Sequence, residues 1–467
     1  MANFSVKILL MSIKFGTDGW RAVIGEQFTF ENVRKVAYAH GLVLQEEGKK
    51  RVVVGYDRRF LSKEFAQEVC KVFLTLGLEA YLSEEECTTP MVSFGVKYLG
   101  FDGGVMITAS HNPGKYNGYK IKESFGGSAR EEFVKKVEEF ANRTQEVKVD
   151  NKKPELIDLK GPYIKKVQEL INLGLFEEED LLVHDAMHGS SAGLFSEALL
   201  NTPLSVVGIR TKRDPLFGGH PPEPIEKYLG PLFDKVRALG ARVGIANDGD
   251  GDRIALCDEK GNFVNTQLIY VLLLLHLLKN KGLKDGVVVK TVSTSYLVDR
   301  ICKAEGVKLL EVPVGFKHIN EVLFREKVIF GGEESGGYGI IHFLPERDGL
   351  FSGLTLLELL YTKGKSLSQI VEEVFETYGS AYYLRHDLHA EEEKKNRLKE
   401  LIKNPPSQIG GFKVKEVITK DGLKLVFEGD GWLLLRASGT EPLIRVYVEM
   451  PTQEQAKEVL KSALEML

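Results

Sequence analysis

Gly104-Val105-Met106-Ile107-Thr108 is a short apolar run, and Ala109-Ser110-His111-Asn112-Pro113 follows it directly. An apolar run of this length, bounded by a turn, is typical of a buried strand. The Asn-Pro pair favours a turn, so we expect Ser110 and His111 to project from the end of a sheet. The same pattern, a buried strand that ends in a polar loop, recurs along the chain and indicates the fold class.

Short β-branched runs alternate with stretches of helical periodicity over the first 305 residues. The pattern predicts strands at 51–55, 104–108, 181–183, 241–246 and 287–290, and helices at 62–76, 131–142, 191–200, 231–239 and 295–305. Such alternation favours α/β layers with parallel strands. The last hundred residues differ, because predicted strands at 416–425, 432–437 and 443–449 precede one closing helix from Gln453.

Domain boundaries are expected where the chain is charged and weakly apolar. Two such stretches are 142–155 and 389–406, and a third boundary near Asp258 follows from spacing alone. At about 150 residues per domain, a chain of 467 residues is expected to hold three domains, give or take one. We therefore predict α/β domains at 1–153, 154–257 and 258–376, and an α+β domain at 377–467.

Composition excludes several classes of partner. The net charge is −4, from 62 basic and 66 acidic residues, so no basic excess calls for nucleic acid. The longest apolar run, 268–278, is well short of the roughly 20 residues of a membrane span and predicts a buried helix. The N-terminal MANFSVKILLMSI lacks a small-residue cleavage site. Four scattered cysteines without a C-x-x-C pair indicate free buried thiols in a cytoplasmic protein. A homo-oligomer is compatible with the sequence.

Asp248-Gly249-Asp250-Gly251-Asp252-Arg253 follows the apolar run 243–246. Alternate glycines let three carboxylates curl toward one point. Two carboxylates 4 Å apart repel by ~1 kcal/mol even in water, so three together imply a bound cation. All-oxygen ligands suit Mg²⁺ or Ca²⁺, and a catalytic Mg²⁺ site is favoured. The alternatives are a simple acidic turn and an EF-hand, although Arg253 occupies the sixth position, where that loop needs glycine.

Three further loops carry reactive or ligand-binding side chains. Ser110 could act as a nucleophile with His111 beside it, although a Ser-His pair in a turn is often only structural. In Gly331–Gly337, Glu333 and Ser335 could bind sugar hydroxyls, or the loop is merely a glycine-rich turn. The fourth loop, with Arg445 on the next strand, offers a phosphate cradle or else a surface turn. Its candidate ligands are Arg436, Ser438, Gly439, Thr440 and Arg445.

The sequences of these loops resemble the motifs of the α-D-phosphohexomutase superfamily. TASHNP (108–113), DGDGDR (248–253), GEESG (332–336) and RASGTEP (436–442) occur in its order and spacing, and FGTDGWR (15–21) fits as well. The resemblance therefore runs from Lys14 to the C-terminus. It implies three similar α/β domains and a smaller C-terminal α+β domain around a central active-site cleft.

The resemblance also implies a phosphosugar mutase. Ser110 would carry a phosphate, with one Mg²⁺ held by Asp248, Asp250, Asp252 and an oxygen at Ser110. That phosphate would pass to a hexose monophosphate, giving a hexose 1,6-bisphosphate that returns its other phosphate to Ser110. Sugar phosphates are the implied partners. Catalysis of this kind rests on positioning and charge neutralisation.

Other roles follow from the same resemblance. Lys120 is the implied general acid/base, supported by His111 and Arg253, with its pKa lowered by neighbouring cations. Arg21 is expected to contact the phosphoserine. Gly315 and Lys317 are expected to contact the sugar, although Val314 stands where the family has threonine.

The sugar is expected to depend on the loop that contains Glu334. GEESG resembles glucomutases, whereas GEMSG and GEQSG resemble mannose/glucose-dual and glucosamine enzymes. Glucose 1-phosphate is therefore favoured, with mannose 1-phosphate as a second substrate.

A serine hydrolase is the alternative of another class. Gly189-Ser190-Ser191-Ala192-Gly193 fits G-x-S-x-G after a strand and before a helix, which would make Ser191 the nucleophile. The histidines His318, His342, His386 and His389 follow it. This alternative leaves the three-aspartate loop and the arginine cradle unexplained.

Overall fold

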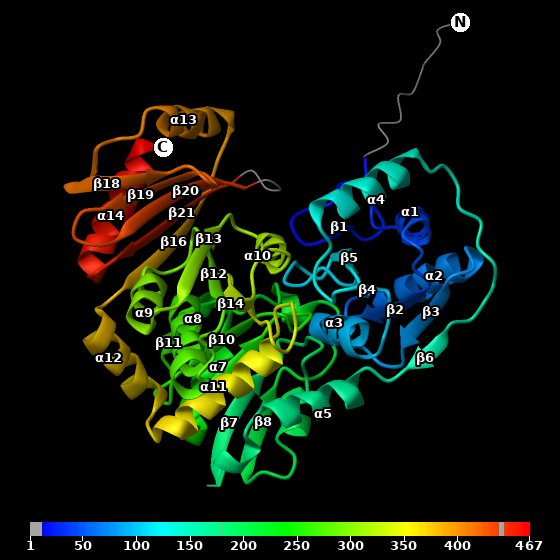
Figure 1. Ribbon diagram of the computed structural model, residues 1–467, viewed down its shortest axis with the longest axis horizontal. Coiled ribbons are helices and arrows are strands. Elements are labelled where there is room, and N and C mark those ends of the chain that lie inside the picture. The colour runs from blue at the N-terminus through cyan, green and yellow to red at the C-terminus, as the bar shows by residue number, and fades with distance from the viewer. Residues whose placement is uncertain (1–11, 178, 439–442) are drawn as a thin grey trace, which may run out of the picture.

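The computed structural model describes residues 12–177, 179–438 and 443–467, and within them the strands form four sheets. Each sheet belongs to one of four units, with the N-terminal and C-terminal units at opposite ends of the arrangement (Figure 1). The predicted fold class, three α/β/α domains and a C-terminal domain with a curled antiparallel sheet, is confirmed.

The first sheet has the order β1-β5-β4-β2-β3-β6. Its strands are β1 (Trp20–Val23), β2 (Arg51–Tyr56), β3 (Glu79–Ser83), β4 (Gly103–Ile107), β5 (Tyr116–Lys122) and β6 (Glu155–Ile157). Helices α1 (Phe30–Glu46), α2 (Ser62–Thr75) and α4 (Glu131–Arg143) cover one face, and α3 (Thr89–Tyr98) and α5 (Lys160–Leu170) the other. Because β6 pairs with β3, this sheet continues past residue 153.

The second and third sheets repeat a similar plan. The second has β8 (Leu204–Ile209), β7 (Asp180–Asp185), β9 (Val243–Asn247), β10 (Ile254–Cys257) and β11 (Phe263–Val264). The third has β13 (Lys308–Val312), β12 (Val287–Thr291), β14 (Val328–Gly332) and β15 (Tyr338–Ile340). Their helices are α6 (Leu194–Ala198), α7 (Gly230–Leu239), α8 (Thr266–Leu275), α9 (Leu297–Glu305), α10 (Phe316–Leu323), α11 (Gly349–Lys363) and α12 (Leu367–Tyr378).

The first three sheets contain both parallel and antiparallel strands, whereas the sequence favoured parallel strands alone. In each of the three units a parallel strand turns back into an antiparallel neighbour, at β4–β5, β9–β10 and β14–β15. The turns at these three places are 108–115, 248–253 and 333–337. Three of the sequence-predicted loops therefore occupy the same position in their respective units.

One apolar core extends through the first three units. The predicted buried helix is confirmed: α8 is followed by one π-helical turn (His276–Asn280), and its residues pack with those of α11, α9 and the second sheet. The four cysteines are buried and unpaired, as predicted. No helix in the described ranges is both long and apolar enough to cross a membrane.

The C-terminal unit is an antiparallel sheet with a core of its own. The order is β16 (Tyr382–His389), β21 (Leu443–Met450), β20 (Trp432–Ala437), β19 (Leu423–Phe427), β18 (Phe412–Ile418) and β17 (Gln408–Ile409). Helices α13 (Glu392–Lys403) and α14 (Gln453–Met466) pack against it.

Two sequence-predicted elements were wrong. The single strand predicted at 416–425 is a hairpin, because Asp421-Gly422 forms a turn and Gly422 adopts a left-handed φ of +93°. The helix predicted at 191–200 covers only Leu194–Ala198, since Gly193 has a φ of +87° and ends the preceding turn.

We expect Gly422→Ala to destabilise the C-terminal unit. The left-handed backbone disfavours a β-carbon, and that carbon would also overlap the carbonyl oxygen of Leu435. Strain of this kind costs about 1–3 kcal/mol, measurable as a lower free energy of unfolding in urea. Gly429→Ala is the matched control, because Gly429 has a φ of +78° but open space around it. Equal losses in the two variants would contradict the role of the overlap.

Candidate active site

Three aspartates meet in the turn between β9 and β10. Asp248, Asp250 and Asp252 are fully buried, and a carboxylate oxygen from each lies within 4.8 Å of the others. Glycine is required between them, because a β-carbon on Gly249 would approach the carbonyl oxygen of Ser110 to 2.5 Å. The turn therefore brings the three carboxylates against the loop that carries Ser110.

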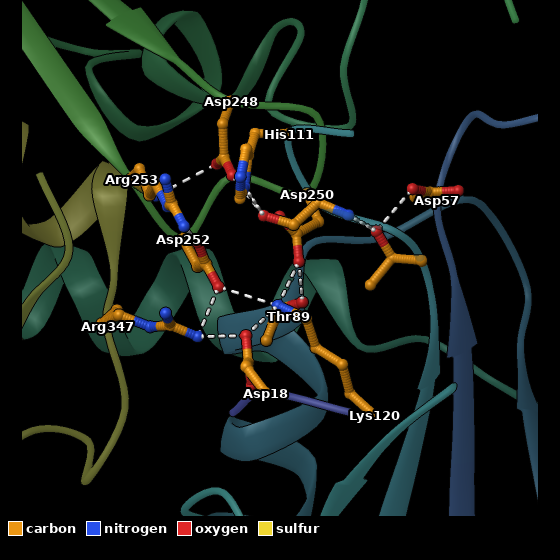
Figure 2. A network of polar contacts seen from close by, with 12 residues as sticks. Asp18, Asp57, Thr89, His111, Lys120, Asp248, Asp250, Asp252, Arg253 and Arg347 are labelled. Carbon is orange, nitrogen blue, oxygen red and sulfur yellow. Dashed lines mark hydrogen bonds and ion pairs between the residues drawn. The ribbon is translucent and has the colours of Figure 1, made fainter. Parts of the chain in front are cut away.

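Two of these carboxylates keep one oxygen without a hydrogen-bond donor. Lys120 Nζ donates to Oδ2 of Asp250 (2.8 Å) and of Asp252 (2.9 Å), as Figure 2 shows. In the described part of the chain, no group donates to the buried Oδ1 atom of either residue. Unsatisfied buried oxygens are costly, and hard divalent cations prefer oxygen ligands. The triad therefore fits a divalent metal ion.

Thr89, the first residue of α3, orients Asp250. Its hydroxyl donates to Asp250 Oδ2 (2.5 Å), and its backbone N–H donates to the carbonyl of the same residue (2.9 Å). Although burial raises the pKa of Asp250, Lys120 and Thr89 lower it overall. Burial and the neighbouring carboxylates of Asp250 and Asp252 raise the pKa of Asp248 instead.

Ser110 lies at the edge of this triad in a strained conformation. Its φ is +50°, and its backbone N–H donates to Thr108 Oγ1 (2.9 Å) while Arg59 donates to its carbonyl (2.5 Å). Ser110 Oγ donates to Asp248 Oδ2 (2.8 Å). Left-handed non-glycine residues persist where the surroundings enforce them, often at functional sites.

The surroundings of His111, beside Ser110, favour its neutral imidazole form. Its Nδ1 lies 3.4 Å from Ser110 Oγ. Burial lowers the pKa of His111 well below its usual value, and the cations of Arg253 and Arg21 lower it further. Arg21 itself donates to Asn112 Oδ1 (2.7 Å), so β1 is tied to the same loop.

The pKa of Lys120 is shifted in the opposite direction to the expectation that neighbouring cations lower it. Burial does lower it, but the carboxylates of Asp18 (2.8 Å), Asp250 and Asp252 raise it well above its usual value. Arg347 joins the same network through Asp18 (2.6 Å) and Asp252 (2.9 Å) (Figure 2). These three carboxylates therefore favour the charged form of Lys120.

One cavity of about 370 Å³ brings together side chains from all four units. Of the sequence-predicted residues, it is lined by Arg21, His111, Arg253, Gly315, Lys317, Glu333, Ser335, Arg436 and Arg445. Arg436 Nε lies 2.8 Å from Asp421, and Arg445 Nε lies 3.9 Å from Asp387. The Ser438 backbone N–H donates to the carbonyl of Leu443 (2.8 Å), whereas Gly439 and Thr440 lie outside the described residues.

Family models match nearly the whole chain. They describe phosphoglucomutase/phosphomannomutase alpha/beta/alpha domain I at 12–148, domain II at 161–261, domain III at 265–378 and the C-terminal domain at 390–466. This chain belongs to the phosphoglucomutase/phosphomannomutase family. It is a phosphohexomutase, and members of its family are isomerases.

Individual relatives span the full length of this phosphohexomutase. A phosphoglucomutase/phosphomannomutase from Thermococcus kodakarensis is 31% identical, over 97% of this chain and 98% of its own. A Methanosphaera stadtmanae protein assigned as a phosphoglucosamine mutase is 33% identical with the same coverage. A crystal structure from Thermus thermophilus, assigned as a phosphomannomutase, superposes with a TM-score of 0.87 at 33% identity, covering 97% of this chain and 98% of that chain.

Two alternatives from the sequence, an EF-hand calcium site and a serine hydrolase, are wrong for this phosphohexomutase. The aspartate loop joins two antiparallel strands, not two helices, so it is not an EF-hand. Ser191 Oγ is buried and has no hydrogen-bond partner among the described residues, so no histidine activates it. Gly189 packs against the carbonyl of Asp248 instead, which places this motif behind the aspartate loop.

Four residues of the site were missed in the sequence. Asp18 lies within the FGTDGWR motif, and Arg347 belongs to the charged triplet 346–348 that follows an apolar stretch. That triplet was a usable signal, because charged residues next to an apolar run are candidates for burial, and a buried charge needs a partner. Arg385, which lines the cavity, and Thr89 had no distinguishing local pattern.

Glu333 lies at the cavity with an unusual carboxyl group. Burial raises its pKa to about 7, although Arg347, 3.7 Å away, lowers it. The fold therefore favours the protonated form, and this stabilisation is complete below the ordinary pKa of 4.5 and is lost as pH rises through 7.

We expect the stability difference between the wild type and Glu333→Gln to depend on pH. From pH 4.5 to 8, without metal or sugar, the wild type should lose on the order of 3 kcal/mol relative to the variant. Denaturant unfolding at several pH values measures this difference. A difference that stays constant with pH would contradict the raised pKa.

Proposed function

We propose that this phosphohexomutase interconverts hexose 1-phosphates and hexose 6-phosphates through a phosphoserine at Ser110. The observation that carries the proposal is the position of Ser110 Oγ, 2.8 Å from an aspartate of the buried triad. The neighbouring cavity is bordered by Arg21 and Arg253 from the first two units and by arginines of the C-terminal sheet. Such a cavity suits a ligand with a phosphate at each end.

Two transfers then balance the reaction. In the first, a sugar hydroxyl bonds to phosphorus as the bond between phosphorus and Ser110 Oγ breaks, and the hydroxyl proton ends on Ser110 Oγ. In the second, Ser110 Oγ bonds to the phosphorus of the other phosphate as the bond from that phosphorus to the sugar oxygen breaks, and the serine proton ends on that sugar oxygen. His111 is the neutral group near enough to Ser110 Oγ to receive the serine proton. We assign Lys120 to charge neutralisation, because neighbouring carboxylates raise its pKa and favour the charged ammonium form.

The metal assigned to the triad is Mg²⁺. When bound, this ion neutralises negative charge on the transferring phosphoryl group. Asp248, Asp250 and Asp252 would hold it through carboxylate oxygens, with an oxygen at Ser110 as a further ligand. Lys120 and Thr89 occupy Asp250 Oδ2, which leaves Oδ1 for the metal.

Glucose phosphate is the proposed preferred sugar, with mannose phosphate second. The resemblance of the GEESG sequence to glucomutases and the Thermococcus phosphoglucomutase/phosphomannomutase support this preference, and the resemblance does not require that Glu334 itself contacts the sugar. Relatives assigned as phosphoglucosamine mutases, at 30–33% identity, support glucosamine phosphate as the alternative. Steady-state rates on the three sugar phosphates decide between them.

Ser110→Ala should abolish mutase turnover and the covalent phosphate. Intact mass of the wild type should show a fraction heavier by one phosphate, and the variant should lack it. Ser191→Ala is the control, because Ser191 lies behind the aspartate loop. This variant should retain both the mutase activity and the covalent phosphate. Turnover at the wild-type rate in Ser110→Ala would refute the assignment.

Thr89→Val should weaken the response to Mg²⁺. A chelator should stop turnover, and the Mg²⁺ concentration that restores half the activity should rise about tenfold in the variant, as is typical when a partner of a metal ligand is lost. Thr88→Val is the matched control, because the buried hydroxyl of Thr88 has no hydrogen-bond partner in the described ranges. The same Mg²⁺ response in both variants would mean that Thr89 does not orient a metal ligand.

A further inference from the structure

Glu334 lies in residues 333–337 between β14 and β15, here called the sugar loop, and its identity suggested glucose. It lines the cavity, but its carboxylate accepts hydrogen bonds from two protein donors. It is only 8% exposed. Ser293 Oγ donates to its Oε2 (2.7 Å), and the Tyr447 hydroxyl donates to its Oε1 (3.3 Å). The backbone carbonyl of Glu334 also accepts from Thr266 Oγ1 (2.5 Å). Both carboxylate oxygens are thus committed to protein donors.

Tyr447 belongs to the C-terminal sheet, so this contact joins two units. The residue is fully buried in an apolar cluster that Val292 of the third unit shares with Trp432 and Leu434 of β20. Tyr447 therefore sits where the third unit packs against the C-terminal sheet. Its hydroxyl donates a hydrogen bond to Glu334 in the sugar loop between β14 and β15.

The cavity arginines surround Tyr447 on the sheet. Arg385 pairs with Tyr447 across β16 and β21, and its guanidinium lies 5.9 Å from the tyrosine ring. Arg445 lies two residues before Tyr447 on the same strand and pairs with Arg436 on β20. A shift of Tyr447 would therefore move the three arginines relative to Glu333 and Ser335.

We propose that Glu334 is a positioning residue that fixes the arginine-bearing face of the C-terminal sheet against the sugar loop. It does not read the hydroxyls of the sugar. This inference rests on the proposed function, because it assigns the arginines to the phosphate that is not reacting. A displaced arginine face weakens binding of every hexose phosphate alike, whereas a sugar-reading residue changes the preference among sugars.

The test compares Glu334→Gln and Tyr447→Phe with the wild type on glucose 1-phosphate and mannose 1-phosphate. Each variant should raise KM about five- to tenfold, as expected for one weakened hydrogen bond to a charged group. The effect on kcat should be smaller, and the ratio of kcat/KM for the two sugars should stay within about twofold. The double variant should lose no more than the more affected single variant, because both changes break one contact.

Tyr383→Phe is the matched control. Tyr383 lies beside the same apolar cluster, and its buried hydroxyl has no hydrogen-bond partner in the described part of the chain. The variant should therefore keep the wild-type KM. A tenfold change in the sugar ratio of Glu334→Gln, or independent effects of Glu334→Gln and Tyr447→Phe, would overturn the proposal.

A second readout separates this inference from the proposed function. Affinity for inorganic phosphate, measured by calorimetry, should fall in Glu334→Gln and Tyr447→Phe but not in Tyr383→Phe. A wild type without mutase turnover would refute the proposed function, and the phosphate series would still test the positioning contact. Unchanged phosphate affinity in both variants would overturn the inference while leaving the mutase assignment intact.

Discussion

Buried charges of opposite sign hold the centre of this molecule. Asp18 and Lys120 come from the first unit, Asp252 from the second and Arg347 from the third, and they contact one another at 2.6–2.9 Å. Lys120, Asp252 and Arg347 are buried, whereas Asp18 is partly exposed at the cavity. A buried charge that loses its partner is strongly destabilising, so the three buried groups depend on one another and on Asp18. One charge network thus joins three units that also share an apolar core. The same network sets the protonation of Lys120 and the direction of the aspartate carboxylates.

Much of the fold could be predicted because it depends on local patterns. Buried strands read as apolar runs, and the polar loops at their ends, at 108–113 and 248–253, marked the site. The antiparallel strand after each loop was not predicted, since an apolar run does not reveal the direction of its neighbour. The turn at Asp421-Gly422 was missed although Asp-Gly is a recognised hairpin signal, because the short strands on both sides were interpreted as one continuous strand.

Site residues that lie within a sequence motif were predicted. Residues that join the site only through contacts between distant parts of the chain were missed. Asp248, Asp250 and Asp252 share a short segment, so their convergence followed from the sequence. Thr89 reaches Asp250 across 161 residues, and Arg347 reaches Asp18 across 329. The expected effect of cations on Lys120 failed for the same reason, because its nearest neighbours in space are carboxylates that lie far away in the chain.

The distribution of apolar cores determines where the chain should tolerate recombination with a homologous protein. The first three units share one apolar core and also have smaller clusters of their own. The C-terminal sheet packs a separate apolar interior and meets the third unit through a small cluster around Trp432 and polar contacts such as Lys424–Glu311. A substitution in the shared core is therefore felt by all three units, whereas the interior of the C-terminal sheet is separate. Recombination between homologues should therefore tolerate a crossover just before β16 far better than one inside the first three units.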